Sequence, residues 1–199
     1  MNIRLVRNLT MLAAFVAGLV LSLGVLLLVR EHMAAPGTPQ AAAIGGPFRL
    51  TDQDGRTVTE ADLKGKPSLV FFGFTHCPDV CPTTLFDISQ ILHVLGPDAD
   101  RTRVVFITVD PERDTQGVLK DYLSSFDPHV TGLTGDLPEI TQVAREYRAY
   151  FKKVPLDGGE YTMDHTAITY LMDKEGRFVS PFSLKRTPEA AAADLRRQL

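Results

Sequence analysis

Cysteine is scarce in this chain. Only Cys77 and Cys81 occur among its 199 residues, and three residues separate them. A fold held together by disulfides needs more cysteines, and it needs them spread along the sequence. Two neighbouring cysteines in a chain that otherwise lacks them point to chemistry at that position rather than to a covalent framework.

Charge of one sign is also lacking. The formal net charge is only −3, and the sequence has no arginine run, acidic block or internal repeat. A nucleic-acid partner therefore has no electrostatic support. The hydrophobic content of 44% is ordinary for a globular protein, so a core can form without disulfides. The chain is long enough for one domain of common size and hardly for two.

A long apolar run lies near the N-terminus. The sequence carries no charge from Leu9 to Val29. At about 1.5 Å of rise per residue, a helix of this length spans a hydrocarbon core of about 30 Å. We therefore predict a transmembrane anchor over residues 9–29. The alternative is a cleaved signal peptide, whose apolar core usually has only about 7–15 residues.

The residues around the anchor predict its orientation. Arg4 and Arg7 precede it, and the positive-inside rule then keeps residues 1–8 in the cytoplasm and exports the rest. Residues 30–45 are rich in alanine, proline and glycine, so we interpret them as a tether. The folded domain is expected over residues 46–199.

Two continuous apolar runs, at residues 68–75 and 103–110, predict strands buried on both faces. Between them, apolar residues recur at helical spacing from Leu85 to Leu95. A strand, a helix and a second strand in this order predict a parallel pair joined by a right-handed crossover. Turn residues at 52–55 predict an opening hairpin before the pair.

Capping patterns predict three more helices, which begin after Thr115, Asp136 and Thr187. The first is expected to end near residue 126 and the second near residue 150. A strand over residues 166–172 and a turn into residues 178–182 predict an antiparallel hairpin. A parallel pair followed by an antiparallel hairpin, with helices on both faces, is typical of an α/β, thioredoxin-like fold with a mixed central sheet.

The two cysteines follow a core strand and precede a helix, at the edge of the sheet that favours ligand sites. Because proline cannot donate a helical hydrogen bond, we expect regular helix to start at Pro82 and to leave Cys81 just outside. Backbone N–H groups there favour thiolates. Three interpretations remain: a soft-metal site for Cu(I) or Zn(II), a redox-active pair, or a structural disulfide whose tiny loop adds little stability.

Three sequence blocks resemble the Sco/SenC family of copper chaperones, which help to assemble cytochrome c oxidase. They are GFTHCPDVCP at residues 73–82, TVDPERDT at 108–115, and DHT at 164–166 followed by Tyr170 and Leu171. The resemblance covers the folded domain, and no block departs from the family pattern. It implies a thioredoxin fold in which Cys77, Cys81 and His165 bind one copper ion, as Cu(I) or also Cu(II). The residues alone do not place His165 beside the sulfurs.

The resemblance also implies partners. The acceptor is expected to be the copper A site of cytochrome c oxidase subunit II, with other exported copper chaperones or thioredoxin-like reductants as further partners. A single-pass protein of a bacterial inner membrane, with its domain in the periplasm, is favoured over a mitochondrial one. The alternative function is a thiol–disulfide oxidoreductase that reduces the copper-ligand cysteines of the oxidase subunit. Cys77 and Cys81 would then be catalytic, so enzyme activity stays open.

Other polar residues near these blocks carry weaker expectations. His76 is interpreted as a neighbour of the ligands and not as a ligand. Asp79 and Asp164 are expected to tune the ligands, to meet a partner or simply to be hydrated. Asp110 is expected either to face a partner or to serve as a turn residue. His93 and His129 are expected to be solvated.

Overall fold

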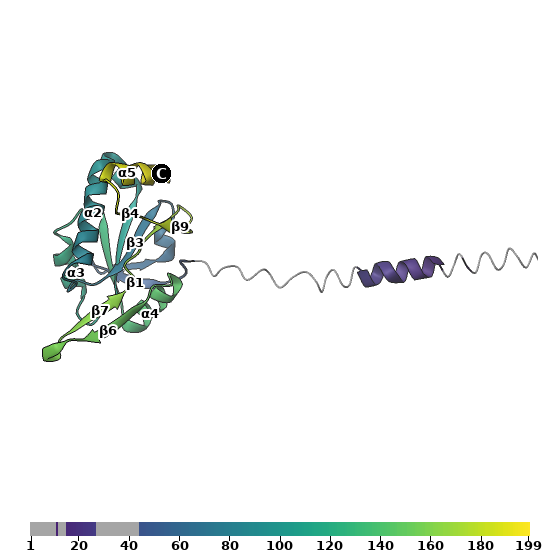
Figure 1. Ribbon diagram of the computed structural model, residues 1–199, viewed down its shortest axis with the longest axis horizontal. Helices are drawn as coiled ribbons and strands as arrows, with labels where there is room; N and C mark the ends of the chain where they lie inside the picture. The colour runs from purple at the N-terminus through teal and green to yellow at the C-terminus, as the bar shows by residue number, and fades with distance from the viewer. Residues whose placement is uncertain (1–10, 12–14, 27–43) are drawn as a thin grey trace, which may run out of the picture. The chain divides into compact units, whose positions relative to one another are not determined.

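The computed structural model describes residues 11, 15–26 and 44–199, and Figure 1 shows their helices and strands. The predicted N-terminal segment 1–8 lies outside the described residues, as does most of the predicted tether 30–45. The predicted anchor 9–29 is described in part, and residues 15–26 are helical. No helix in this described portion combines the length and the apolar character that a membrane crossing requires.

The folded unit is described from residue 44 onward. Its strands are β1 (Arg49–Asp52), β2 (Thr57–Thr59), β3 (Ser68–Gly73), β4 (Arg103–Thr108), β5 (Val130–Thr134), β6 (Phe151–Pro155), β7 (Tyr161–His165), β8 (Thr169–Met172) and β9 (Phe178–Pro181). Its helices are η1 (Glu60–Leu63), α2 (Val80–Leu95), η2 (Gly96–Arg101), α3 (Gln116–Leu123), α4 (Leu137–Glu146), η3 (Asp157–Gly159) and α5 (Pro188–Arg196).

Seven strands form one mixed sheet in the order β2-β1-β5-β4-β3-β8-β9. β3 runs parallel to β4 and antiparallel to β8, and β8 and β9 form the closing antiparallel hairpin. The predicted parallel pair, opening hairpin and closing hairpin are therefore confirmed. β8 begins only at Thr169, because residues 166–168 form the connection from β7, which ends at His165.

The predicted caps are confirmed. The side chains of Thr115, Asp136 and Thr187 each accept a hydrogen bond from the backbone N–H three residues later. Two helices end earlier than predicted, α3 at Leu123 and α4 at Glu146. After α4 the chain turns at Arg148, whose φ of 52° lies in the left-handed region that ends helices.

Alternation along β3 directs neighbouring aromatic rings to opposite faces of the sheet. The ring of Phe71 lies 5.9 Å from that of Phe106, which in turn lies 6.1 Å from Tyr122 of α3. The ring of Phe72 instead lies 5.5 Å from that of Tyr147, just after α4. α3 and α4 therefore cover different faces, and α5 packs against α2.

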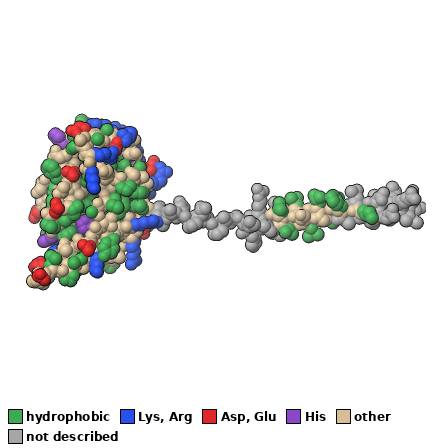
Figure 2. Space-filling view, in the orientation of Figure 1, with side chains coloured by type: hydrophobic (Ala, Val, Ile, Leu, Met, Phe, Trp, Pro, Cys, Tyr) green, Lys and Arg blue, Asp and Glu red, His purple; other side chains and the backbone are tan. Residues whose placement is uncertain are grey.

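The sequence does not predict β6 and β7. They pair with each other and form a separate two-stranded sheet, the hairpin labelled at the lower edge of Figure 1. Side chains in the middle of β6 are exposed, so this strand lacks the apolar alternation by which strands are recognised. Asp157 and Glu160 lie between the two strands and are exposed, and Figure 2 shows acidic side chains at this end of the domain.

Candidate metal centre

Cys77 and Cys81 lie where β3 meets α2, at the carboxyl end of the central strand. Both are free thiols. Cys81 has no exposed surface and Cys77 is 9% exposed. The two thiols therefore face the interior of the domain, with Cys77 nearer to solvent.

The prediction that helix α2 begins at Pro82 was wrong. The helix starts at Val80 and includes Cys81. Pro82 is tolerated because the first residues of a helix have no partner for their N–H groups within the helix. The turn is closed instead by the N–H of Thr83, which donates to the carbonyl of Asp79 at 3.2 Å.

The helix start affects the two sulfurs differently. The backbone N–H of Cys81 lies 3.4 Å from Sγ of Cys77 and donates to it, as expected for a sulfur at a helix N-terminus. For Cys81, however, burial raises the pKa of the thiol well above its usual range, and a hydrogen bond from the backbone of Phe74 only partly opposes this. The prediction of a favoured thiolate is therefore wrong for Cys81 in the metal-free protein.

His165 ends strand β7 and meets the two sulfurs. Its Nε2 lies 3.6 Å from Sγ of Cys81, and the ligand atoms of Cys77, Cys81 and His165 all lie within 4.8 Å of one another. No other group of three histidine, cysteine or acidic side chains within the described residues is arranged to hold a metal ion. The structure thus brings together the three residues that the resemblance implied.

The surroundings of His165 set its protonation and its orientation. Nδ1 lies 3.2 Å from the carbonyl oxygen of Thr166, to which it can donate, and Nε2 is left to face the sulfurs. The rings of Phe71 and Phe74 meet the imidazole edge-on at 6.3 Å and 5.7 Å between centroids. Burial lowers the pKa of His165, so the ring is held in the neutral form that binds metals.

Gly73 allows the close packing of Cys81 against β3. A Cβ atom at Gly73 would lie 2.9 Å from Sγ of Cys81 and 2.7 Å from Cε2 of Phe106. Both distances are shorter than real side-chain contacts, so a larger residue would displace the thiol. The last residue of β3 therefore determines where this sulfur lies.

Asp114, which is fully buried, ties the segment before Cys77 to the sheet. Its carboxylate accepts hydrogen bonds from the backbone N–H of Thr75 at 3.0 Å and from the Thr75 hydroxyl at 2.6 Å. The hydroxyl of Thr108, at the end of β4, donates to the same carboxylate at 2.6 Å. A buried carboxylate with several donors orders the backbone around it, and here that backbone leads directly to Cys77.

Asp110 and Arg113 connect the same loop to the β6–β7 hairpin. Asp110 is buried, accepts a hydrogen bond from Tyr161 Oη at 3.0 Å, and is paired with Arg113. Arg113 also donates from Nη1 to the carbonyl oxygen of Tyr161 at 3.1 Å. Asp110 therefore does more than end the strand before a turn, because it contacts the hairpin directly. The sequence placed Asp110 and Arg113 in a family block but gave no indication of which segment they contact.

The remaining singled-out residues lie around or away from the site. His76 is exposed and lies 3.1 Å from the Thr75 hydroxyl, through Nδ1. Asp79, Asp164 and His93 are exposed. The prediction that His129 is simply solvated was wrong, because it pairs with Asp127 at 2.6 Å and with Asp100 at 2.9 Å.

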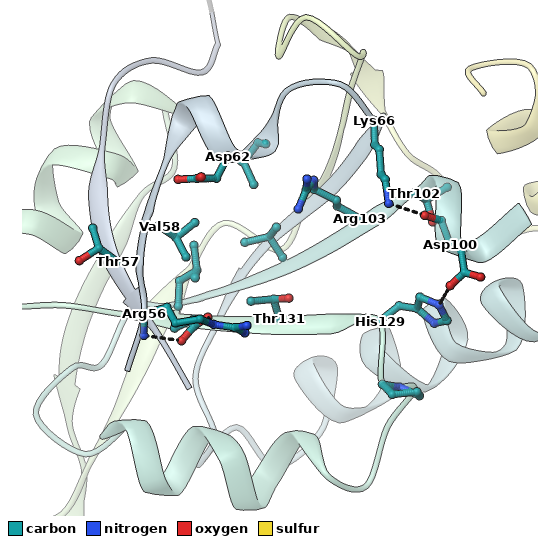
Figure 3. A pocket seen from close by; sticks show the side chains of 15 residues that line it. Arg56, Thr57, Val58, Asp62, Lys66, Asp100, Thr102, Arg103, His129 and Thr131 are labelled. Carbon is teal, nitrogen blue, oxygen red and sulfur yellow. Dashed lines mark hydrogen bonds and ion pairs between the residues drawn. The ribbon is translucent and has the colours of Figure 1, made fainter. Parts of the chain in front are cut away.

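A cavity of about 470 Å³ lies at the opposite end of β4, where Arg103 begins the strand (Figure 3). Several of its charged side chains already have partners. Lys66 donates to the carbonyl oxygen of Asp100 at 2.5 Å, and His129 pairs with the carboxylate of Asp100. The cavity contains no cysteine and is unrelated to the three-residue cluster.

The family model described as SCO1/SenC matches residues 36–199. The chain belongs to the SCO1/SenC family. Among curated relatives of this SCO1/SenC protein, "Protein SCO1 homolog 1, mitochondrial" of Arabidopsis thaliana is 45% identical over 153 residues, which is 75% of this chain and 46% of the relative. The chain thus spans about half the length of that relative.

Solved structures of Sco proteins resemble it over most of its length. The structure of Bradyrhizobium japonicum ScoI with copper bound is 66% identical, with a TM-score of 0.77, over 79% of this chain and 100% of that chain. BsSco, described with a disulfide switch and as a member of the Sco family of cytochrome c oxidase assembly proteins, is 25% identical, with a TM-score of 0.63, over 80% and 95% of the two chains. The predicted thioredoxin-like α/β fold is confirmed.

Proposed function

We propose that this SCO1/SenC protein binds one copper ion as Cu(I) through Cys77, Cys81 and His165 and delivers it during assembly of cytochrome c oxidase. The acceptor is the copper A site of oxidase subunit II. The observation that carries this proposal is the convergence of two sulfurs and one imidazole nitrogen within 4.8 Å. The bound copper of the Bradyrhizobium relative supports it.

The donor atoms suit Cu(I). Thiolate sulfur and neutral imidazole are soft or borderline ligands, which favour Cu(I) and Zn(II) over hard cations such as Mg²⁺ and Ca²⁺. Partial burial lowers the pKa of His165 and so favours its neutral form.

Copper binding by the purified full-length chain under reducing conditions tests the proposal. We expect one Cu(I) per chain, and losses of affinity in the variants Cys77→Ala, Cys81→Ala and His165→Ala. His93→Ala is the matched control, since His93 is an exposed histidine on α2. Unchanged copper affinity in any of the three ligand variants would contradict the proposed site.

The second candidate function is a thiol–disulfide oxidoreductase that reduces the copper-ligand cysteines of the oxidase subunit. Two free cysteines at the start of a helix in a thioredoxin-like fold favour it, and the disulfide switch of BsSco supports it. Cys77 would be the attacking thiol because it is the more exposed of the pair. Mixed disulfides trapped through Cys77 in a Cys81→Ser variant would favour this function, particularly if His165→Ala left the exchange intact.

We further propose that residues 9–29 anchor the protein in a bacterial inner membrane and that the domain faces the periplasm. An exported compartment oxidises thiols, and a disulfide binds no copper. The partners therefore include an exported thioredoxin-like reductant as well as another copper chaperone that supplies the ion. Fractionation of cells, followed by protease treatment of spheroplasts, tests the anchor and the orientation.

A further inference from the structure

The β6–β7 hairpin carries His165 but has no strand pairing with the main sheet. An isolated two-stranded hairpin is at best marginally stable in water. Its position against the core must therefore come from side-chain contacts and from its two ends. Buried Met163 provides one such contact, and hydrogen bonds between Tyr150 and Thr166 close the base of the hairpin.

Arg113 makes the most extensive polar contact with this hairpin. Its guanidinium donates to Asp110 through Nε and to the carbonyl oxygen of Tyr161 through Nη1. The same group lies over the Tyr161 ring, 3.7 Å from its centroid. Tyr161 also contacts the carboxylate that Arg113 pairs with, because its hydroxyl donates to Asp110. The arginine side chain is 19% exposed and the aspartate side chain 3%, so solvent screens the pair little.

Arg113 also contacts a ring that packs against the imidazole of His165. Its guanidinium carbon is 5.9 Å from the centroid of the Phe74 ring, and that ring packs edge-on against His165. The exposed pair formed by Lys153 and Glu112 joins the same two segments, but exposed ion pairs contribute little. One half-buried arginine thus contacts both the strand that ends at His165 and a ring that packs against His165.

We propose that Arg113 is a positioning residue that holds the β6–β7 hairpin so that His165 faces Cys77 and Cys81. This inference rests on the proposed copper-binding function. Arg113 touches no ligand atom, and it acts only by fixing the third ligand. A lysine could not replace it, because a single ammonium group cannot form the planar two-pronged contact.

The test compares full-length wild type with Arg113→Gln, and uses Arg177→Gln as the control, an exposed arginine at the β8–β9 turn. In the metal-free protein, Arg113→Gln should speed amide hydrogen exchange in residues 151–165 by about tenfold or more, while β3 and β4 keep their protection. Cu(I) affinity should fall about tenfold, in the range found for residues that orient metal ligands. X-ray absorption should show a weaker nitrogen contribution at the copper.

A double-mutant cycle separates positioning from general destabilisation. In a His165→Ala background, Arg113→Gln should change Cu(I) affinity by less than about twofold, since its effect passes through the missing imidazole. An equal loss in both backgrounds, or unchanged hairpin exchange in Arg113→Gln, would overturn the inference. If Arg113→Gln does not fold, Tyr161→Phe removes only the hydroxyl bond to Asp110 and should change exchange and affinity in the same direction. If wild type bound no copper, the proposed function would fail and hydrogen exchange would still decide whether Arg113 holds the hairpin.

Discussion

Sγ of Cys81 lies 3.6 Å from Nε2 of His165, although the two residues are 84 positions apart. One atom belongs to a buried thiol with a raised pKa, and the other to a half-buried imidazole with a lowered pKa. Both shifts favour the neutral forms, so the thiol can donate its hydrogen to the ring. A metal ion that enters the site takes the place of that proton.

The first prediction concerns copper and pH. Because burial raises the pKa of the Cys81 thiol, we expect Cu(I) binding to release its proton. Each proton released makes affinity rise by about tenfold per pH unit. Competition with a Cu(I) chelator between about pH 6 and about pH 8 measures the slope. Cys81→Ser should have a slope that is smaller by one proton, and a wild-type affinity that does not depend on pH would contradict the raised pKa.

The second prediction concerns Gly73→Ala. The new methyl group would collide with Sγ of Cys81 and with Phe106, so we expect a loss of about 1–3 kcal/mol in the free energy of unfolding together with weaker copper binding. Urea denaturation measures the first and chelator competition the second. Gly117→Ala is the matched control, because a methyl group there meets no atom within 4 Å. Equal behaviour of the two variants would show that Gly73 has no special role.

The third prediction concerns Asp114→Asn. An amide cannot accept the hydrogen bonds that Thr75 and Thr108 give to both carboxylate oxygens, and hydrogen bonds to buried charged groups contribute about 1.5–3 kcal/mol each. We expect a comparable loss in the free energy of unfolding, measured by urea denaturation. The exposed aspartate Asp164 supplies the control, Asp164→Asn. If both substitutions had the same small effect, the carboxylate would not be ordering the segment before Cys77.

The fourth prediction concerns His129. Hydrogen bonds to Asp100 and Asp127 raise its pKa above the usual 6.5, so the folded protein binds a proton there more tightly than the unfolded chain. The resulting stability is fully present below about pH 6.5 and is lost as pH rises through the raised pKa. Compared with wild type, His129→Gln should lose less than about 1 kcal/mol, because the pair is partly exposed.

The free energies of unfolding of wild type and His129→Gln, measured from below about pH 6.5 to above the raised pKa of His129, should converge at high pH. Asp100→Asn should reduce the difference between them, since it removes one of the two acceptors. A difference that grows with pH would contradict the sign of the shift.

Local signals in the sequence were enough to predict the elements that lie near each other along the chain. Thr115, Asp136 and Thr187 mark helix starts because their side chains bond to a backbone three residues away. The apolar run at β3 predicts a buried strand without knowledge of its neighbours. The positions of Cys77 and Cys81 at the end of that strand follow in the same way, although Pro82 misled the prediction of where the helix begins.

The strands and site contacts that the sequence does not predict depend on contacts between distant segments. Phe151–Pro155 alternates poorly because its strand pairs only with β7 and leaves its middle residues exposed, so no pattern distinguishes it from a loop. His165 meets Cys81 only because the chain returns to β3 through β8. From the residues alone it is one histidine among five. The resemblance to the family identified His165, whereas the contacts of Gly73 and Arg113 are apparent only in the folded structure.

The separate β6–β7 sheet has a consequence for the fate of a transported ion. Handing an ion to another protein proceeds by stepwise substitution, in which an incoming ligand replaces an outgoing one. Both sulfurs lie where β3 meets α2, whereas the imidazole belongs to the β6–β7 hairpin. In the proposed copper-loaded protein, withdrawal of the imidazole would break no hydrogen bond of the seven-stranded sheet, so the coordination number could drop from three to two while the core stays intact. The histidine would then be the first ligand to leave.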